Sequence, residues 1–327
     1  MSNDAFGSRA AAAKVLVTGG SGFIGRNVVA ALRAVGLPVR VVDLVPHPDP
    51  DVEIVLGDLA RAEVIDASLA GGIDAIVHLA AVTSVLRSVE QPALTYRTNV
   101  AATAALLEAA READVRALVF ASTNAVVGPM QGASITESDL PQPLTPYGAT
   151  KAAGEMLMSA YTSSYGLRCA CLRLTNVYGL GMALKDSIIA RLMRAIRTGS
   201  TFEVYGDGRQ VRDYVNVADV TAAIQLALGD ERWHGPVVIG SGTSRSVLEV
   251  VEAVREVTGA VIDVTNGPAR AGEMPAVVVD TAVARSRGWS PRYTLAGGLA
   301  GVWEEWSGAD MSAAPPHAPA AQAGGAR

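Results

Sequence analysis

Short apolar runs alternate with longer alanine-rich stretches over the first half of the chain. Continuous apolar strands separated by helices are typical of a parallel sheet that is buried on both faces. The pattern predicts a doubly wound α/β sheet of the Rossmann type. Its six predicted strands are KVLVT (14–18), VRVVDL (39–44), VEIVLGDL (52–59), IDAIVHLAA (73–81), VRALVFAST (115–123) and RCACLRLTN (168–176).

Three helices are predicted between these strands, over residues 25–36, 98–113 and 147–166. The second and third are apolar on more than one side, and such helices must be buried by the core or by a partner. We therefore expect a homodimer that forms through the helices near 98–113 and 147–166.

The rhythm changes after residue 176, where glycine-rich loops interrupt the pattern. Residues 177–306 are predicted to form mainly a smaller, mixed α/β C-terminal lobe, with some segments returning to the sheet. Within it, SVLEVVEAVREVTG (246–259) has the serine and glutamate spacing of a capping box. Residues 1–13 and the Ala/Pro/Gly-rich residues 307–327 are expected to be a disordered lead and a disordered tail.

Composition narrows the classes of function. Half of the 327 residues are hydrophobic and the formal net charge is -5, so no basic surplus exists for nucleic acid, although a small phosphorylated ligand is compatible. No membrane span or signal peptide is apparent, and a cytoplasmic protein is expected. Cys169 and Cys171 are predicted to pack in the core, and the four histidines lack metal-ligand spacing, so no metal is expected.

A glycine loop, TGGSGFIG, follows the first strand and opens the first helix. Gly20, Gly22 and Gly25 satisfy G-x-G-x-x-G in the context that binds a dinucleotide pyrophosphate. Asp43 ends the second strand, where a carboxylate can accept hydrogen bonds from the adenosine ribose and repel a 2′-phosphate, which favours NAD over NADP. Asp58, after the third strand, either meets the adenine side or caps the next helix.

Tyr147 and Lys151 stand one helical turn apart, just after Pro146, and would share one helix face. An exposed helix carries such a pair by chance. With the glycine loop upstream and the polar cluster STN (122–124) ending the fifth strand, the pair predicts acid/base chemistry, because an ammonium and a positive nicotinamide would lower the phenol pKa towards 7.

The motifs together resemble the extended short-chain dehydrogenase/reductases, in particular the NAD-dependent nucleotide-sugar epimerases and dehydratases. The resemblance covers roughly residues 14–306 and rests on TGGSGFIG, GDL, HLAA, TNV, AST…VVG, YGATK, LRLTNVYG and RDYVNVADV. It implies an NAD-binding domain over 14–176, a lobe over 177–306 that binds a nucleotide-diphosphate sugar, and no nucleic-acid or membrane partner.

The resemblance also implies roles for individual residues. Catalysis would use Thr123, Tyr147 and Lys151. The cofactor would contact Gly19, Gly22, Phe23, Ile24, Gly25, Asp43, Asp58, Leu59, Leu79, Ala80, Ala81, Thr83, Asn99, Tyr147 and Lys151. The substrate would contact Thr123, Tyr147, Asn176, Arg212 and Arg270, the two arginines gripping the diphosphate unless they form surface ion pairs.

One departure bears on the reaction. Asn124 and Ala125 stand where the family's dehydratases carry an Asp-Glu pair and its decarboxylases a Glu. Because elimination uses a carboxylate as acid or base, dehydration and decarboxylation lose support. The sequence therefore predicts a nucleotide-sugar 4-epimerase. A ketosugar reductase or dehydrogenase, a 4,6-dehydratase and a non-catalytic NAD sensor stay as alternatives, and the nucleotide and the sugar are left open.

Overall fold

The computed structural model describes residues 13–130, 132–183, 185–268 and 276–308. Nearly all of the expected lead and tail therefore lies outside the described residues. The last described helix continues through Gly308, so the chain is still helical at 307, where the tail was predicted to begin. Within the described residues, no helix is both long and apolar enough to span a bilayer.

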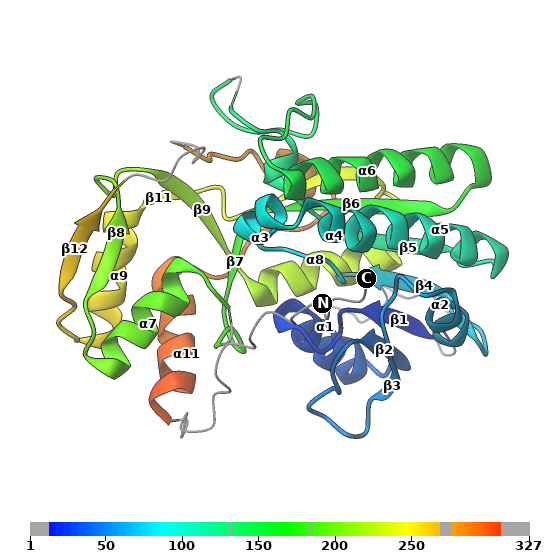
Figure 1. Ribbon diagram of the computed structural model, residues 1–327, viewed down its shortest axis with the longest axis horizontal. Helices are drawn as coiled ribbons and strands as arrows, with labels where there is room; N and C mark the ends of the chain where they lie inside the picture. The colour runs from blue at the N-terminus through cyan, green and yellow to red at the C-terminus, as the bar shows by residue number, and fades with distance from the viewer. Residues whose placement is uncertain (1–12, 131, 184, 269–275, 309–327) are drawn as a thin grey trace, which may run out of the picture.

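Seven parallel strands form the central sheet, in the order β10-β6-β5-β4-β1-β2-β3 (Figure 1). This arrangement confirms the predicted doubly wound sheet. β10 comes from the second half of the chain and pairs in parallel with β6 at one edge. The strands are β1 (Val15–Thr18), β2 (Val39–Asp43), β3 (Glu53–Leu56), β4 (Ala75–His78), β5 (Ala117–Thr123), β6 (Arg168–Leu174) and β10 (Gly235–Ile239).

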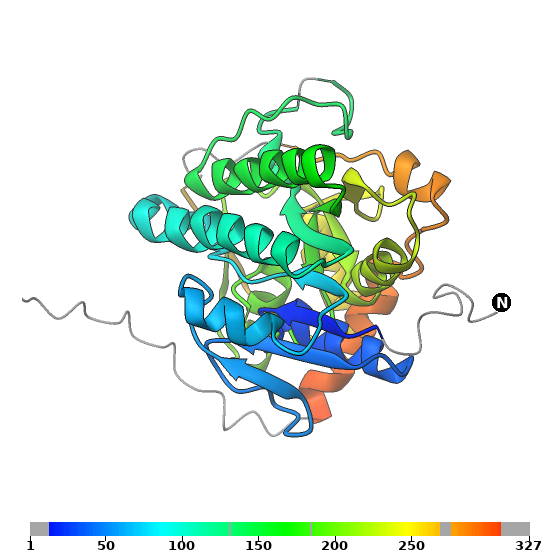
Figure 2. The same cartoon turned by 90° about the vertical axis from the view of Figure 1, so that its right-hand side faces the viewer.

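Alternate residues of each strand enter two separate cores, one on each face of the sheet. Val15 and Val17 of β1 pack towards α1 and α8, whereas Leu16 packs towards α2, α5 and α6. Figures 1 and 2 show α5 and α6 side by side along the sheet. The helices of this domain are α1 (Phe23–Ala34), α2 (Ala62–Leu69), α3 (Val85–Glu90), α4 (Pro92–Tyr96), α5 (Ala102–Glu112), α6 (Pro146–Tyr165) and α8 (Val217–Gly229), with the 3-10 turn η3 (Asn124–Val126).

A smaller lobe lies at the left of Figure 1 and has its own apolar core. Its helices and strands are β7 (Asn176–Tyr178), α7 (Ile188–Thr198), β8 (Phe202–Tyr205), β9 (Val211–Asn216), β11 (Ser244–Ser246), α9 (Val247–Thr258), β12 (Val264–Gly267) and α11 (Leu295–Gly308), and the short α10 (Ala282–Ser286) follows β12 in the chain. The predicted capping box of α9 is present, since Ser246 and Glu249 bond each other's backbone N–H groups.

Of the predicted boundaries that differ from the structure, two change how the elements are connected. The predicted strand 168–176 divides, because β6 ends at Leu174 and β7 joins β9 in a separate sheet. The predicted helix 98–113 begins earlier, at Pro92, and runs through α4, the π-helical turn η2 (Arg97–Ala101) and α5 without a break. Proline favours the first turn of a helix, which accounts for the earlier start.

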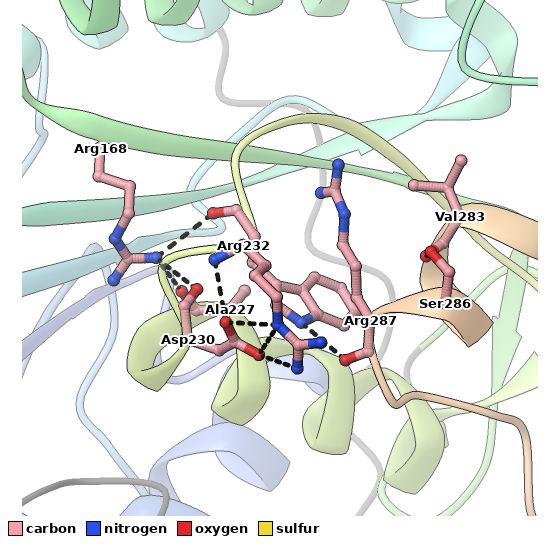
Figure 3. Close-up of polar contacts among 8 residues, drawn as sticks. Arg168, Ala227, Asp230, Arg232, Val283, Ser286 and Arg287 are labelled. Carbon is pink, nitrogen blue, oxygen red and sulfur yellow. Dashed lines mark hydrogen bonds and ion pairs between the residues drawn. The ribbon is translucent and has the colours of Figure 1, made fainter.

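Arg168, the first residue of β6, fastens α8 to the sheet (Figure 3). Its guanidinium donates to the carbonyl oxygens of Ala227 and Leu228 at 2.6 and 2.7 Å, at the end of α8. Those carbonyls have no partner within the helix, and a cation there also favours the negative end of the helix dipole. Arg168 thus ties a helix from the second half of the chain to the first domain.

Candidate active site

The glycine loop between β1 and α1 has the shape that a pyrophosphate requires. Gly19 has φ +69°, and a Cβ there would lie 2.8 Å from the backbone nitrogen of Ala80. A Cβ on Gly25 would lie 2.2 Å from the carbonyl oxygen of Gly19. The helix behind the loop, α1, receives no side-chain cap at Gly22, so its first N–H groups are free to bind an anion. Phe23 and Ile24 form the first turn.

Asp43 lies at the carboxyl end of β2, beside this loop. Its carboxylate accepts hydrogen bonds from the N–H of Ser21 at 2.9 Å and of Val45 at 3.3 Å. Two carboxylate oxygens can accept further bonds, so Asp43 can also receive ribose hydroxyls. Asp58 is exposed and accepts the N–H of Ala60 in the turn before α2, whose N-cap is Arg61, so the helix-capping alternative is not what the structure shows.

A buried hydrogen-bonded group holds the segment after β4, where the sequence placed cofactor contacts. Thr18 accepts the N–H groups of Leu79 and Ala80 and bonds His78 at 2.7 Å. Burial lowers the pKa of His78 to about 3, so this ring is neutral and structural. The hydrogen bonds bring Leu79 and Ala80 to the mouth of the glycine loop, and Ala81 and the exposed Thr83 follow. Leu59, by contrast, is buried in the apolar core.

Asn99 is buried within the π-helical turn η2. Its side chain exchanges hydrogen bonds with the backbone of Val82 at 2.8 and 3.0 Å and donates to Thr150 at 3.1 Å. Both donors of the amide are therefore used inside the protein. The structure gives Asn99 the role of tying the segment after β4 to α6, and the cofactor contact of this residue stays a prediction.

Tyr147 lies in the first turn of α6, which starts at an N-cap, Thr145, and a proline, Pro146. Its phenol faces the Thr123 hydroxyl at the end of β5. Burial raises the pKa of Tyr147 to about 12, and the nearby Thr123 hydroxyl opposes this. The protein's own groups thus favour the protonated phenol, and the lowering of its pKa by Lys151 together with a positive nicotinamide ring stays a prediction.

The amine of Lys151 makes its contacts on β5. Nζ donates to the carbonyl oxygen of Ala121 at 2.8 Å and lies 4.5 Å from the centre of the Phe120 ring. The side chain is buried, and desolvation lowers its pKa to about 7, with the charges of Cys171 and Glu155 acting in the opposite direction. Lys151 is thus placed beneath the end of β5, on the helix that carries Tyr147.

Glu155, a further turn along α6, is a residue that the sequence argument missed. Its carboxylate accepts the Ser122 hydroxyl at 2.5 Å and pairs with Arg173 at 2.9 Å, and both charged side chains are almost fully buried. Because strand residues alternate in direction, Ser122 faces this ion pair while Thr123 faces Tyr147. The four-residue spacing from Lys151 to Glu155 in YGATKAAGE places both side chains on one face of the helix, and it could have indicated Glu155.

The two non-acidic positions at the end of β5 lie beside Thr123. Asn124 is buried, and the Ala125 N–H donates to the Thr123 hydroxyl at 3.2 Å. Among the described residues near Lys151, Glu155 is the carboxylate whose charge reaches the amine, and Arg173 already neutralises it. This part of the site offers acid/base chemistry through a phenol.

The predicted diphosphate ligands come from the small sheet between the two cores. Asn176 on β7 pairs in register with Tyr214, two residues beyond Arg212 on β9, so Asn176 and Arg212 belong to one face of adjacent strands. Asp213 is fully buried and accepts hydrogen bonds from Thr175, Ser241 and Thr243. These bonds hold β9 in place. Arg270 lies outside the described residues.

These features define a class of protein. A doubly wound sheet carries an uncapped glycine loop and an acidic residue after β2, as dinucleotide-binding proteins do, and a tyrosine and a lysine follow on one helix. Glycines without room for a side chain, free N–H groups and the carboxylate of Asp43 all fit a dinucleotide that lacks a 2′-phosphate.

Comparison with known proteins gives the family. Residues 15–240 match the profile of the NAD dependent epimerase/dehydratase family, and the chain belongs to it. It is similar to a UDP-glucose 4-epimerase of Thermus thermophilus solved with NAD, with a TM-score of 0.86 and 34% identity, covering 90% of this chain and 99% of that one.

Two further proteins show how wide the likeness is. MoeE5, solved with UDP-glucuronic acid and NAD, has a TM-score of 0.84 and 38% identity, covering 90% of this chain and 98% of that one. A dTDP-glucose 4,6-dehydratase of Streptomyces niveus is 36% identical over 305 residues, covering 88% of this chain and 90% of its own. The cofactor of the chain is NAD, as its family and these complexes show.

Replacing Asp43 by alanine should weaken NAD binding by about 10- to 100-fold, since charge-assisted hydrogen bonds are worth about 1.5–3 kcal/mol each. Isothermal titration of NAD would measure the change. Asp66→Ala, which removes an exposed carboxylate from α2, is the control for lost charge. An unchanged NAD affinity in Asp43→Ala would refute the assignment of Asp43 to the ribose.

Proposed function

We propose that the protein is an NAD-dependent nucleotide-sugar 4-epimerase. The observation that carries the proposal is the composition of the site. Tyr147 and Thr123 adjoin each other, while Asn124 and Ala125 replace the acidic pair of a dehydratase and Arg173 occupies the carboxylate of Glu155. Inverting one carbinol carbon needs a single acid/base, and the site provides one.

NAD, when bound, supplies a hydride acceptor and donor next to the sugar. Tyr147 would take the proton of the sugar 4-hydroxyl and later return it to the same oxygen, after the keto sugar has turned its opposite face towards the hydride donor. Thr123 would hold that hydroxyl by a hydrogen bond. The Lys151 ammonium, buried beneath the end of β5, would stabilise negative charge on the phenol oxygen.

The keto sugar has to turn over between the two proton transfers. For that, the diphosphate must stay bound while the sugar leaves its first position. Asn176 and Arg212 on the sheet of β7 and β9 are suited to hold it, and a guanidinium binds two phosphate oxygens at once. Arg270 stays a sequence prediction for the same role. We further propose that residues 14–176 bind the cofactor and that 177–306 mainly bind the nucleotide sugar.

The decisive experiment incubates the protein with a panel of UDP-, dTDP- and GDP-sugars and follows the product by NMR. Epimerisation gives the 4-epimer with no accumulation of reduced cofactor. Reduced cofactor in proportion to substrate would instead identify a dehydrogenase or a ketosugar reductase. No turnover of any sugar, with NAD still bound, would favour the NAD-sensing alternative.

A second candidate function is 4,6-dehydration, which the 36% identity to the Streptomyces niveus dehydratase favours. It would need a carboxylate from elsewhere in the chain to remove the proton at C5. The same NMR experiment detects it, because a 6-deoxy product carries a new methyl group. Such a product would replace the epimerase proposal.

We also propose that the protein acts as a homodimer in the cytoplasm. The proposed interface lies on the helices near 98–113 and 147–166, and apolar side chains are exposed on α6 and on α3 and α4, which pack against it. Sedimentation velocity would show a species of twice the chain mass, and a monomer at micromolar concentration would contradict the proposal. The exposed residues are Leu86, Val89, Tyr96, Met156 and Tyr165.

A further inference from the structure

Lys185 lies in the segment between β7 and α7, and its backbone is held on both sides. Its N–H donates to the carbonyl oxygen of Met182 at 2.9 Å, and its own carbonyl oxygen accepts from Arg194 at 3.2 Å. The side chain reaches back to β7, where Nζ donates to the carbonyl oxygen of Val177 at 3.1 Å. Nζ also lies 5.1 Å from the centre of the Phe23 ring.

The ammonium of Lys185 has no anion to balance it among the described residues. The ammonium contacts a carbonyl oxygen and a ring face, while the neighbouring Asp186 is exposed and lies 4.0 Å from Arg194. Desolvation alone lowers the pKa of Lys185 to about 8. A cation that loses water without gaining a counter-ion is unfavourable, and an anionic ligand bound beside it would offset that cost.

The two contacts of Nζ indicate which anion it would meet. Phe23 is the first residue of α1, whose uncapped N-terminus and glycine loop suit a pyrophosphate. Val177 directly follows Asn176, which is expected to hold the diphosphate of the substrate. The ammonium therefore stands between two phosphate-binding segments, one from each domain.

We propose that Lys185 binds a phosphate oxygen of a ligand held at the junction of α1 and β7. The ligand is a nucleotide with linked phosphates, either the pyrophosphate of NAD or the diphosphate of the nucleotide sugar. The second source rests on the proposed function, whereas the first requires only that the chain binds NAD.

Lysine usage in the chain supports a specific role. Lys14, Lys151 and Lys185 are the lysines among 27 basic residues, and all others are arginine. Lys14 pairs with Glu53 at 2.5 Å and Lys151 belongs to the proposed catalytic site. A compact ammonium can approach one phosphate oxygen in a space too narrow for a planar guanidinium.

The test measures binding and not turnover. A first screen identifies which of UDP, dTDP or GDP raises the melting temperature of the wild type. That nucleotide and NAD are then titrated separately into nucleotide-free wild type, Lys185→Met and Lys185→Arg. Lys185→Met should weaken one of the two ligands by about tenfold or more, and Lys185→Arg by less, because a charge-assisted bond is lost only in the first. Arg232→Met, which removes an exposed charge paired with Asp230, is the control.

The two arms identify the source of the phosphate. Weaker binding of NAD alone assigns Lys185 to the cofactor, and weaker binding of the nucleoside diphosphate alone assigns it to the substrate. Unchanged affinity for both, within about twofold, overturns the proposal. A protein that binds NAD through Lys185 but interconverts no sugar would refute the proposed function and leave this inference intact.

A second measurement on the wild type guards against a variant that folds poorly. Limited acetylation followed by peptide mass spectrometry reports the reactivity of each lysine, with Lys14 as the internal reference. The ligand that Lys185 binds should slow acetylation of Lys185 relative to Lys14. Equal rates with and without both ligands would show that Lys185 is structural and would overturn the proposal.

Discussion

Tyr147→Phe should lower turnover by about 100-fold or more while leaving NAD affinity unchanged, as expected for the loss of a general acid/base. The substitution removes one oxygen and keeps the ring that fills the space beside Thr123. Steady-state kinetics with the best nucleotide sugar from the panel, together with a titration of NAD, would measure both quantities. Loss of NAD binding would instead mean that the phenol supports the cofactor site structurally.

Tyr161→Phe provides a matched control on the same helix. Its hydroxyl donates to Glu108 at 2.8 Å, on the surface between α5 and α6 and remote from Thr123. This variant loses a phenol hydroxyl and a hydrogen bond without touching the proposed chemistry. If both variants lost activity equally, the effect would belong to α6 as a whole and the acid/base role of Tyr147 would fail.

Because the pKa of Tyr147 is about 12, the phenol is protonated at neutral pH and must lose its proton before it can act as a base. Desolvation opposes the phenolate, and one of the three N–H donors of Lys151 is bound to the Ala121 carbonyl oxygen. Lowering the pKa of Tyr147 from about 12 to near 7 takes about 5 pKa units, or roughly 7 kcal/mol. That stabilisation of the phenolate has to come from positive charges close to the phenol oxygen. The positive nicotinamide ring and a turn of the Lys151 side chain are the sources that the family's chemistry makes available.

Local sequence patterns were sufficient for the fold. The apolar runs predicted six of the seven strands of the large sheet, and the glycine loop predicted the start of α1 within two residues. The seventh strand, β10, was not specified, because its short run Gly235–Ile239 becomes a sheet edge only by pairing with β6 far back in the chain. The division of 168–176 at Thr175 likewise depends on bonds to Asp213 that no local pattern reveals.

The candidate site was predictable where it depends on spacing within one element. Tyr147 and Lys151 follow from a helical repeat, and Asp43 follows from the end of a strand. The ion pair of Glu155 with Arg173 could not be predicted, because the two residues are 18 positions apart and lie on different elements, α6 and β6. The direction of the Lys151 side chain was equally hidden, since the Ala121 carbonyl that receives it belongs to β5 and carries no side-chain signal.

Lys151→Met should abolish most activity and, at the same time, make the protein more stable. The pKa of Lys151 falls from its ordinary value of 10.5 to about 7, with desolvation as the largest cause. The folded state therefore disfavours the ammonium. Removing the amine should raise the free energy of unfolding by about 1–3 kcal/mol near neutral pH, after allowing for the lost bond to Ala121.

The increase in the free energy of unfolding of Lys151→Met should depend on pH, because the pKa of Lys151 is lower in the folded protein than in the unfolded chain. Below about pH 7 the amine is charged in both the folded and the unfolded chain, and the wild type carries the whole desolvation cost. Between about 7 and 10.5 the folded amine is neutral while the unfolded amine stays charged, so wild-type stability rises with pH. The advantage of Lys151→Met should thus be largest near about pH 6 and should shrink towards about pH 10.

Urea unfolding of the wild type and Lys151→Met at about pH 6 and about pH 9 would measure this difference. Lys14→Met, which removes a partly exposed amine paired with Glu53, is the control for the loss of a lysine. A stability gain for Lys151→Met that is the same at both pH values, or a loss at both, would show that the buried amine is not the strained group. In that case the buried Lys151 amine would not destabilise the folded protein, and the prediction that Lys151→Met gains stability while it loses activity would be wrong.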